Sequence, residues 1–174
     1  MMMLILLAML AIQVQTASSP PGSLPLDAPY VPTPPRVVDA MLKMARVTKQ
    51  DVVFDLGCGD GRIPIEAARQ YGARGVGIDL DPKRIEDATE NAKAAGVGDK
   101  VRFAAENVFD TDFRDATVVF LYMSLDVNQR LMPKLKALKP GARVVSHVFD
   151  MGPSWPPDER GATDGKTYYL WVIK

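Results

Sequence analysis

The chain has 174 residues, about the size of one domain, and its 47% apolar and 24% charged residues exclude a wholly disordered or fibrous protein. Its 21 basic residues balance its 21 acidic residues, so the chain lacks the positive charge expected of a nucleic-acid-binding protein. A single cysteine and a single histidine exclude an internal disulfide and a zinc site built from several such ligands, and we expect no metal.

Residues 1–19 form an apolar leader that differs from the rest of the chain. Asp27 is the only charged residue before Arg36. The apolar run is shorter than the roughly 20 residues that span a bilayer, and it suits the core of a secretory signal or a short membrane anchor. Two further interpretations stay open: an apolar helix that packs on the domain, and a start codon assigned too early. We expect a membrane-associated protein facing the cytoplasm, or an exported one if the leader is cleaved.

Residues 20–33 form a proline-rich linker before the domain at 34–174. Seven of the fourteen prolines fall within residues 20–35. Proline lacks a backbone N–H and fixes φ, so this stretch favours neither a helix nor an inner strand. Its end, residues 29–34, is apolar, and we expect it to lie on the domain surface.

From residue 34 onward, short apolar strands alternate with amphipathic helices. We expect helices at 34–45, 62–71, 82–95 and 127–138, and strands at 52–56, 75–80, 101–105, 116–122, 142–149 and 167–173. This alternation predicts an α/β fold, a doubly wound Rossmann-like sheet that is mostly parallel and covered on both faces. Residues 150–166 contain no helical pattern, so the C-terminal part is short and the last strand should return antiparallel.

A glycine loop follows the first predicted strand. Gly57 and Gly59 let the backbone turn sharply around the small Cys58 and approach a ligand closely. The G-x-G-x-G spacing differs from the G-x-G-x-x-G of dinucleotide sites. Asp55 and Asp60 would repel a diphosphate and attract a cation such as an amino group or a sulfonium.

Further polar residues follow the next two strands. Asp79 lies 24 residues after Asp55, where a carboxylate can accept hydrogen bonds from both hydroxyls of a ribose. Asn107, after the third strand, is placed to meet an adenine amino group, with Leu80 and Val108 against the ring faces. Ribose, adenine and a cationic amino-acid tail together describe S-adenosylmethionine (SAM).

Residues 55–61, residues 77–79 and Asn107 resemble motifs I, post-I and II of class I SAM-dependent methyltransferases, although Asp is commoner than Asn at the last position. The resemblance covers about residues 29–174. Four shorter segments resemble small bacterial relatives of the mitochondrial protein-lysine methyltransferases that modify ATP synthase c subunit and the adenine nucleotide translocase: 29–34, 60–63, 145–147 and 150–152. The narrower resemblance implies that Tyr30 closes over SAM.

The same resemblance implies in-line N-methylation of a lysine in a protein substrate, and the apolar leader suggests a membrane protein. Tyr122, Asp126 and Asp150 follow strand ends and are the predicted catalytic residues. For Asp126 a helix cap, and for Asp150 a turn, are the simpler interpretations. His147 is expected to be a packed strand residue rather than a base.

Three other functions stay open at this point. A small-molecule methyltransferase and a SAM-binding module without catalysis would share the same cofactor residues, and a nicotinamide dehydrogenase is disfavoured by the glycine spacing. Residues 122–125 lack the Asn/Asp-Pro-Pro-Tyr motif of nucleic-acid amino-methyltransferases, so adenine or cytosine amines are not the expected acceptors.

Overall fold

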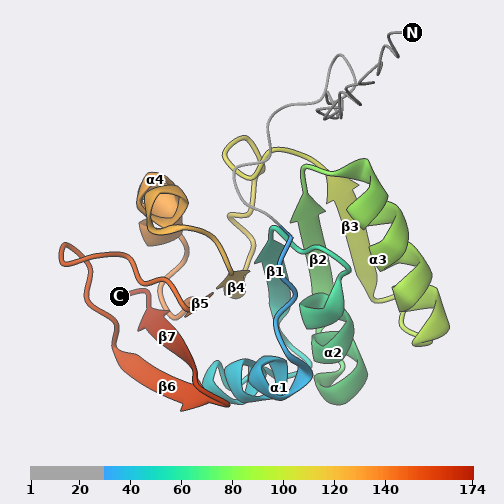
Figure 1. The fold of residues 1–174 in the computed structure, drawn as a ribbon, viewed down its shortest axis with the longest axis horizontal. Helices are drawn as coiled ribbons and strands as arrows, with labels where there is room; N and C mark the ends of the chain where they lie inside the picture. The colour runs from blue at the N-terminus through green and yellow to red at the C-terminus, as the bar shows by residue number, and fades with distance from the viewer. Residues whose placement is uncertain (1–29) are drawn as a thin grey trace, which may run out of the picture.

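The computed structural model describes residues 30–174, and the predicted leader and most of the predicted linker lie outside them. One seven-stranded sheet has the order β3-β2-β1-β4-β5-β7-β6 (Figure 1). The helices are α1 Pro35–Met44, α2 Arg62–Tyr71, α3 Pro82–Ala94 and α4 Leu125–Lys136. The strands are β1 Val52–Leu56, β2 Arg74–Asp79, β3 Val101–Ala105, β4 Val118–Leu121, β5 Arg143–His147, β6 Glu159–Thr163 and β7 Lys166–Val172.

Strands β3, β2, β1, β4 and β5 are parallel, and β7 pairs antiparallel with β5 as predicted. Strand β6 lies within residues 150–166, where the sequence pattern predicts no regular element. It is an edge strand without a buried apolar face, and its pairing with β7 through the turn at Asp164 and Gly165 defines it. A polar edge strand of this kind carries little of the alternation that indicates a strand in a sequence.

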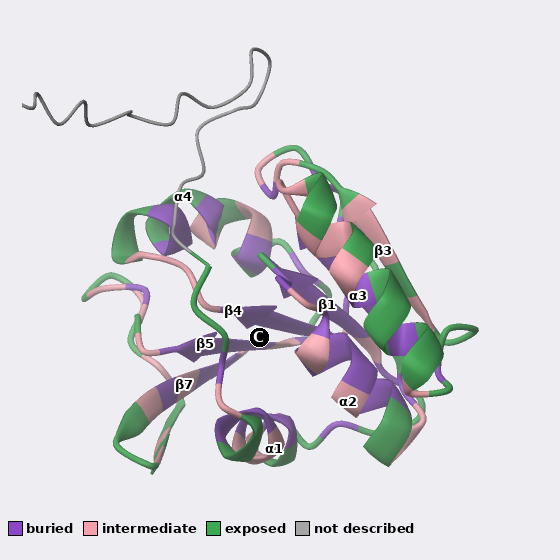
Figure 2. Cartoon of the chain, turned by 45° about the vertical axis from the view of Figure 1, so that its right-hand side comes forward, coloured by how far each residue is buried: buried purple, intermediate pink, exposed green. Residues whose placement is uncertain are grey.

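The two faces of the sheet are covered by different elements. Helices α1 and α2 pack on one face against apolar residues of β1, β4, β5 and β7, and α3 joins α2 on the same side. Helix α4 and the segment 108–116 cover the other face. Figure 2 shows the central strands buried and the helices exposed on their outer sides. Both faces are therefore covered, as continuous apolar strands require.

The order of the strands fixes where a ligand can bind. Strand β1 lies between β2 and β4. Strands β2 and β3 are added on one side of it and the later strands on the other, so its carboxyl end is the topological switch point. The register aligns Leu56 of β1 with Ile78 of β2 and Leu121 of β4, which places the three following loops at one edge. Helices long and apolar enough to cross a membrane are absent from residues 30–174.

Candidate active site

The loop between β1 and α2 has a backbone that only glycine adopts readily. Gly57 and Gly59 have φ of 81° and 53°, in the left-handed region. The N–H groups of Gly57 and Cys58 both donate to the carbonyl of Ile78, at 2.8 and 2.9 Å, and tie the loop to β2. A Cβ at Gly57 would lie 2.6 Å from Cε of Met123. The glycines therefore leave space at the end of β1 for a ligand to approach the backbone closely.

Two carboxylates flank this loop. Burial, with the nearby charges of Asp79 and Asp60, raises the pKa of Asp55 to about 8. Asp79 holds the loop, since its Oδ2 accepts from the Gly59 N–H at 2.8 Å and its Oδ1 accepts from the Asp81 N–H at 3.0 Å. A carboxylate has about four acceptor positions, so Asp79 keeps two for a ligand, as many as the predicted hydrogen bonds from ribose hydroxyls require. A buried carboxylate such as Asp55 is stabilised by a cationic ligand group.

Tyr30 and the residues after it lie over the glycine loop. The Arg84 guanidinium is 4.1 Å from the Tyr30 ring centroid, and a Cβ at Gly59 would lie 2.4 Å from that ring. Arg62 donates to the Thr33 carbonyl at 2.7 Å and forms an ion pair with Asp60. Arg84 and Arg62 thus hold the N-terminal segment over the loop, the first through Tyr30 and the second through Thr33.

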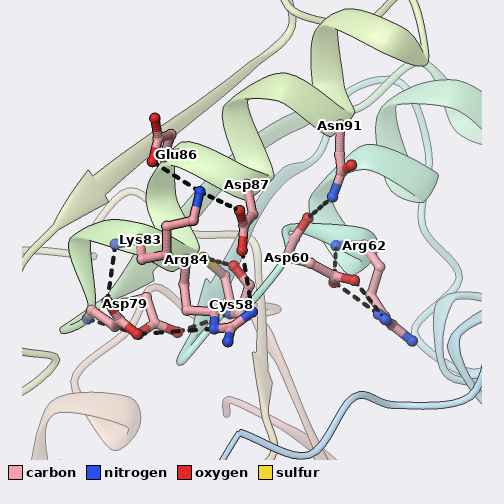
Figure 3. Close-up of polar contacts among 11 residues, drawn as sticks. Cys58, Asp60, Arg62, Asp79, Lys83, Arg84, Glu86, Asp87 and Asn91 are labelled. Carbon is pink, nitrogen blue, oxygen red and sulfur yellow. Dashed lines mark hydrogen bonds and ion pairs between the residues drawn. The ribbon is translucent and has the colours of Figure 1, made fainter.

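Helix α3 supports the same loop from behind (Figure 3). The side-chain amide of Asn91 donates to the Asp60 carbonyl at 3.0 Å. Arg84 is paired with Asp87 at 3.2 Å on the same helix. Because α3 begins at the N-cap Asp81 directly after β2, the strand that supplies Asp79 also orients the helix that holds the loop.

A pocket of about 450 Å³ opens at this edge of the sheet. All nine residues predicted to bind the cofactor line it: Tyr30, Asp55, Gly57, Cys58, Gly59, Asp79, Leu80, Asn107 and Val108. The Asn107 side-chain oxygen accepts from the Phe109 N–H at 3.0 Å, which leaves its amide nitrogen for a ligand. The donors and acceptors that the sequence analysis assigned to ribose, adenine and an amino-acid tail therefore surround one cavity, and they fit SAM.

The structure separates the three predicted catalytic residues. Tyr122 lines the pocket beside His147, with ring centroids 4.1 Å apart. Asp126 does not line it: its side chain is 80% exposed and lies 3.8 Å from Arg130. Asp150 also lies outside the lining, where its Oδ1 accepts from the Gly152 N–H at 2.8 Å in a turn. The geometry therefore favours Tyr122 among the three.

His147 is fully buried, as expected of a packed strand residue. Its Nδ1 lies 3.1 Å from the Thr33 hydroxyl, and its Nε2 has no partner among the described residues. Burial and the charge of Lys166 lower its pKa to about 4, so the ring is neutral at pH 7. Through Thr33 it joins the end of β5 to the segment that covers the glycine loop.

Sequence reasoning missed several residues of the pocket. They are Val31, Thr33, Arg62, Ile63, Asp81, Arg84, Met123, Ser124 and Phe149. Asp81, Met123 and Ser124 lie one or two positions past a predicted strand end, so extending those strands would have found them, and Phe149 is the last residue of the strand predicted at 142–149. Arg84 is different, because it reaches the pocket from the first turn of α3. The sequence feature that could have pointed to it is its position three residues after the N-cap Asp81.

The fold and this pocket define a SAM-dependent methyltransferase. The ANTKMT methyltransferase domain matches residues 55–159, and the chain belongs to that family. A solved structure from Salinibacter ruber, described as an RNA methyltransferase in complex with S-adenosyl-L-homocysteine, shares 53% identity and a TM-score of 0.80 over 82% of this chain and 94% of that one. That bound product identifies SAM as the co-substrate.

Curated relatives agree on the family. A protein-lysine N-methyltransferase of Saccharolobus islandicus (strain REY15A) is 45% identical over 83% of this chain and 93% of its own length. The adenine nucleotide translocase lysine N-methyltransferase of Mus musculus is 38% identical, and the match covers 76% of this chain and 57% of the mouse enzyme. The resemblance inferred from the sequence motifs is therefore confirmed at the level of the family.

Proposed function

We propose that the protein transfers a methyl group from SAM to the side-chain nitrogen of a lysine in a protein substrate. The observation that carries this proposal is the 45% identity with a protein-lysine N-methyltransferase across 93% of that enzyme. The Salinibacter ruber protein is named for a different acceptor, RNA. The choice between these acceptors rests on the charges around the pocket.

The arginines at the pocket are each paired with carboxylates. Arg62 forms an ion pair with Asp60, and Arg84 with Asp87. Nucleic-acid binding depends on cations that neutralise phosphates, and a paired guanidinium contributes little to that. Together with the zero net charge of the chain, this pairing supports a protein acceptor.

The chemistry asks little of the protein beyond positioning. SAM supplies an activated methyl group on a sulfonium. The neutral lysine nitrogen forms the new N–C bond as the S–C bond breaks, the sulfur leaves as a neutral thioether, and the methylated nitrogen then loses a proton. Deprotonating a lysine with a pKa near 10.4 costs about 4–5 kcal/mol at pH 7. Tyr122, at the end of β4, is the residue we assign to orienting that nitrogen.

We also propose that the acceptor is a membrane protein and that residues 1–19 hold the enzyme at the cytoplasmic side of the membrane. The apolar composition of these residues supports this, and SAM is a cytosolic metabolite, which an exported enzyme would lack. Fractionation of cells that express the whole chain or residues 20–174 tests the tether. Equal recovery of both in the soluble fraction would refute it.

A label-transfer experiment tests the proposed acceptor. The purified protein is incubated with methyl-labelled SAM and with membrane, soluble-protein, RNA and small-molecule fractions of the source cell. Asp79→Ala should abolish transfer, while Asp115→Ala, at an exposed aspartate that does not line the pocket, should not. Methyl-lysine in acid hydrolysates of a protein band supports the proposal.

The other outcomes separate the alternatives. Label in RNA that is removed by ribonuclease would establish the acceptor named for the Salinibacter ruber protein. Label only among small molecules would establish a small-molecule methyltransferase. SAM binding without transfer to any fraction would favour a binding module.

A further inference from the structure

The lining of the pocket divides into two halves of different chemistry. One half comes from the ends of β1, β2 and β3 and contains the residues assigned to SAM, including the carboxylates Asp55 and Asp79. The other half comes from the ends of β4 and β5 and contains Tyr122, Met123, Ser124 and Phe149. Carboxylates are absent from this second group of lining residues. Since the first half accounts for the nucleoside and the amino-acid tail, the second half faces the space left for the acceptor.

Two aromatic rings dominate the second half. The Tyr122 and Phe149 ring centroids lie 6.4 Å apart, with an angle of 33° between the planes. Phe149 is 39% exposed, which is unusual for a phenylalanine and leaves its ring available to a ligand. His147 packs against the Tyr122 ring at 4.1 Å and limits how that ring can turn.

The backbone that presents Phe149 is held in an uncommon conformation. Val148 has a φ of 66°, which is rare for a β-branched residue and is maintained only when its surroundings impose it. Backbone bonds on both sides of Val148 hold it, since the Val148 N–H donates to the Thr167 carbonyl and the Phe149 N–H to the His147 carbonyl, each at 2.8 Å. The buried Asn128 amide holds the residues that follow, donating to the carbonyls of Phe149 at 3.2 Å and Asp150 at 3.1 Å. The Ser146 hydroxyl also donates to the Phe149 carbonyl. These buried donors thus fix the turn that points Phe149 at the pocket.

We propose that Tyr122 and Phe149 form the acceptor subsite and select a primary alkylamine, the side chain of lysine, which deepens the proposed function and rests on it. The two rings bury the methylene stem, and their faces attract the partial positive charge that grows on the nitrogen during transfer. Without a carboxylate beside it, the amine is not held as an ammonium ion, and exclusion of water favours its neutral, nucleophilic form.

Substitutions of Phe149 test this subsite. Steady-state kinetics with a lysine peptide and calorimetry with SAM are measured for Phe149→Ala, Phe149→Leu and Phe149→Tyr. We expect Phe149→Ala to raise the KM for the peptide by about tenfold and to leave the Kd for SAM within about twofold. Phe149→Tyr should stay near the wild type, and Phe149→Leu, which keeps bulk without a ring, should fall between them.

Leu125 provides the matched control. It is 42% exposed, as much as Phe149, and it adjoins the lining residue Ser124 but does not line the pocket. Leu125→Ala should therefore leave the peptide KM within about twofold. Circular dichroism checks that each variant is folded. If the alanine variant does not fold, the tyrosine and leucine variants still test the subsite.

Two results would overturn the subsite. An unchanged peptide KM in both Phe149→Ala and Phe149→Leu would remove Phe149 from acceptor binding, and equal losses in SAM affinity and peptide KM would assign it to the SAM half. If the wild type labels another acceptor and no lysine, the proposed function fails and the amine selectivity fails with it. A raised KM for that acceptor in Phe149→Ala would still locate acceptor binding between β4 and β5.

Discussion

SAM binding should release a proton from Asp55. Burial and two neighbouring carboxylates raise the pKa of Asp55 to about 8, so about nine in ten molecules of the free protein carry this proton at pH 7. The ammonium group of SAM favours the ionised carboxylate in the complex. The ligand amine, with a pKa near 8, takes up about 0.1 proton at pH 7, so the net release is about 0.8. SAM affinity should therefore rise about tenfold per pH unit between pH 5 and 7 and level off near pH 8.

Calorimetry in buffers of different ionisation enthalpy measures this release directly. At pH 7 the slope of binding enthalpy against buffer enthalpy gives the number of protons exchanged, expected at about 0.8 for the wild type. Asp55→Asn keeps the shape of the side chain but cannot ionise, so its slope should change sign to about 0.1 proton taken up. A wild-type slope near zero at pH 7 would show that Asp55 keeps the same protonation state when SAM binds, and would refute the expected proton release.

Three further changes test other contacts of the site. Gly59→Ala places a Cβ 2.4 Å from the Tyr30 ring, so it should weaken SAM binding at least about tenfold more than the control Gly96→Ala. The backbone at Gly96 is also left-handed, but its surroundings are open. Equal losses in the two variants would exclude Tyr30 from SAM binding. His147 has its pKa lowered to about 4, so the unfolded chain takes up the proton first as pH falls below about 6.5. The wild type should therefore lose stability relative to His147→Phe between pH 6.5 and 4, by up to about 1.4 kcal/mol per pH unit in urea denaturation, and parallel curves would contradict this. Asp126→Asn should keep kcat within about twofold because its side chain is exposed outside the pocket, and a larger loss would restore the catalytic role predicted from the sequence.

The elements with sharp local boundaries were predicted most accurately from the sequence. Strand β1 and helix α2 have the predicted bounds. Gly57 ends the apolar run of β1, and Gly61 and Gly72 flank α2 at its two ends. Helix α4 begins two residues earlier than predicted, since Ser124 caps it by accepting from the Val127 N–H at 3.4 Å. Strand β6 could not be predicted, since its order comes from pairing with β7 rather than from burial of its own side chains.

The same contrast separates the predicted cofactor residues from the proposed acceptor residues. Asp55 and Asp79 could be placed at the pocket from the sequence because the ends of adjacent parallel strands meet at one edge, which is a property of the topology alone. Asp126 follows a strand end too, but it lies within the first turn of α4, and the helix directs its side chain to solvent. Phe149, the last residue of the strand predicted at 142–149, was not assigned to the pocket because its direction is set by the left-handed Val148 and by a hydrogen bond from Asn128 of α4, which the sequence pattern does not show.

The two halves of the pocket suit the two partners of a methyl transfer. A sulfonium and an amino-acid tail carry charges that must be held without water, and the carboxylates and backbone N–H groups around the glycine loop supply fixed partners for them. The nucleophile has the opposite requirement, since a strong ion pair would keep the amine protonated and raise the barrier. An aromatic half fixed by Asn128 and His147 positions the amine without that penalty. A subsite without a carboxylate among the lining residues from β4 and β5 therefore suits the proposed nucleophile, and the position of Asp126 and Asp150 outside the pocket agrees with it.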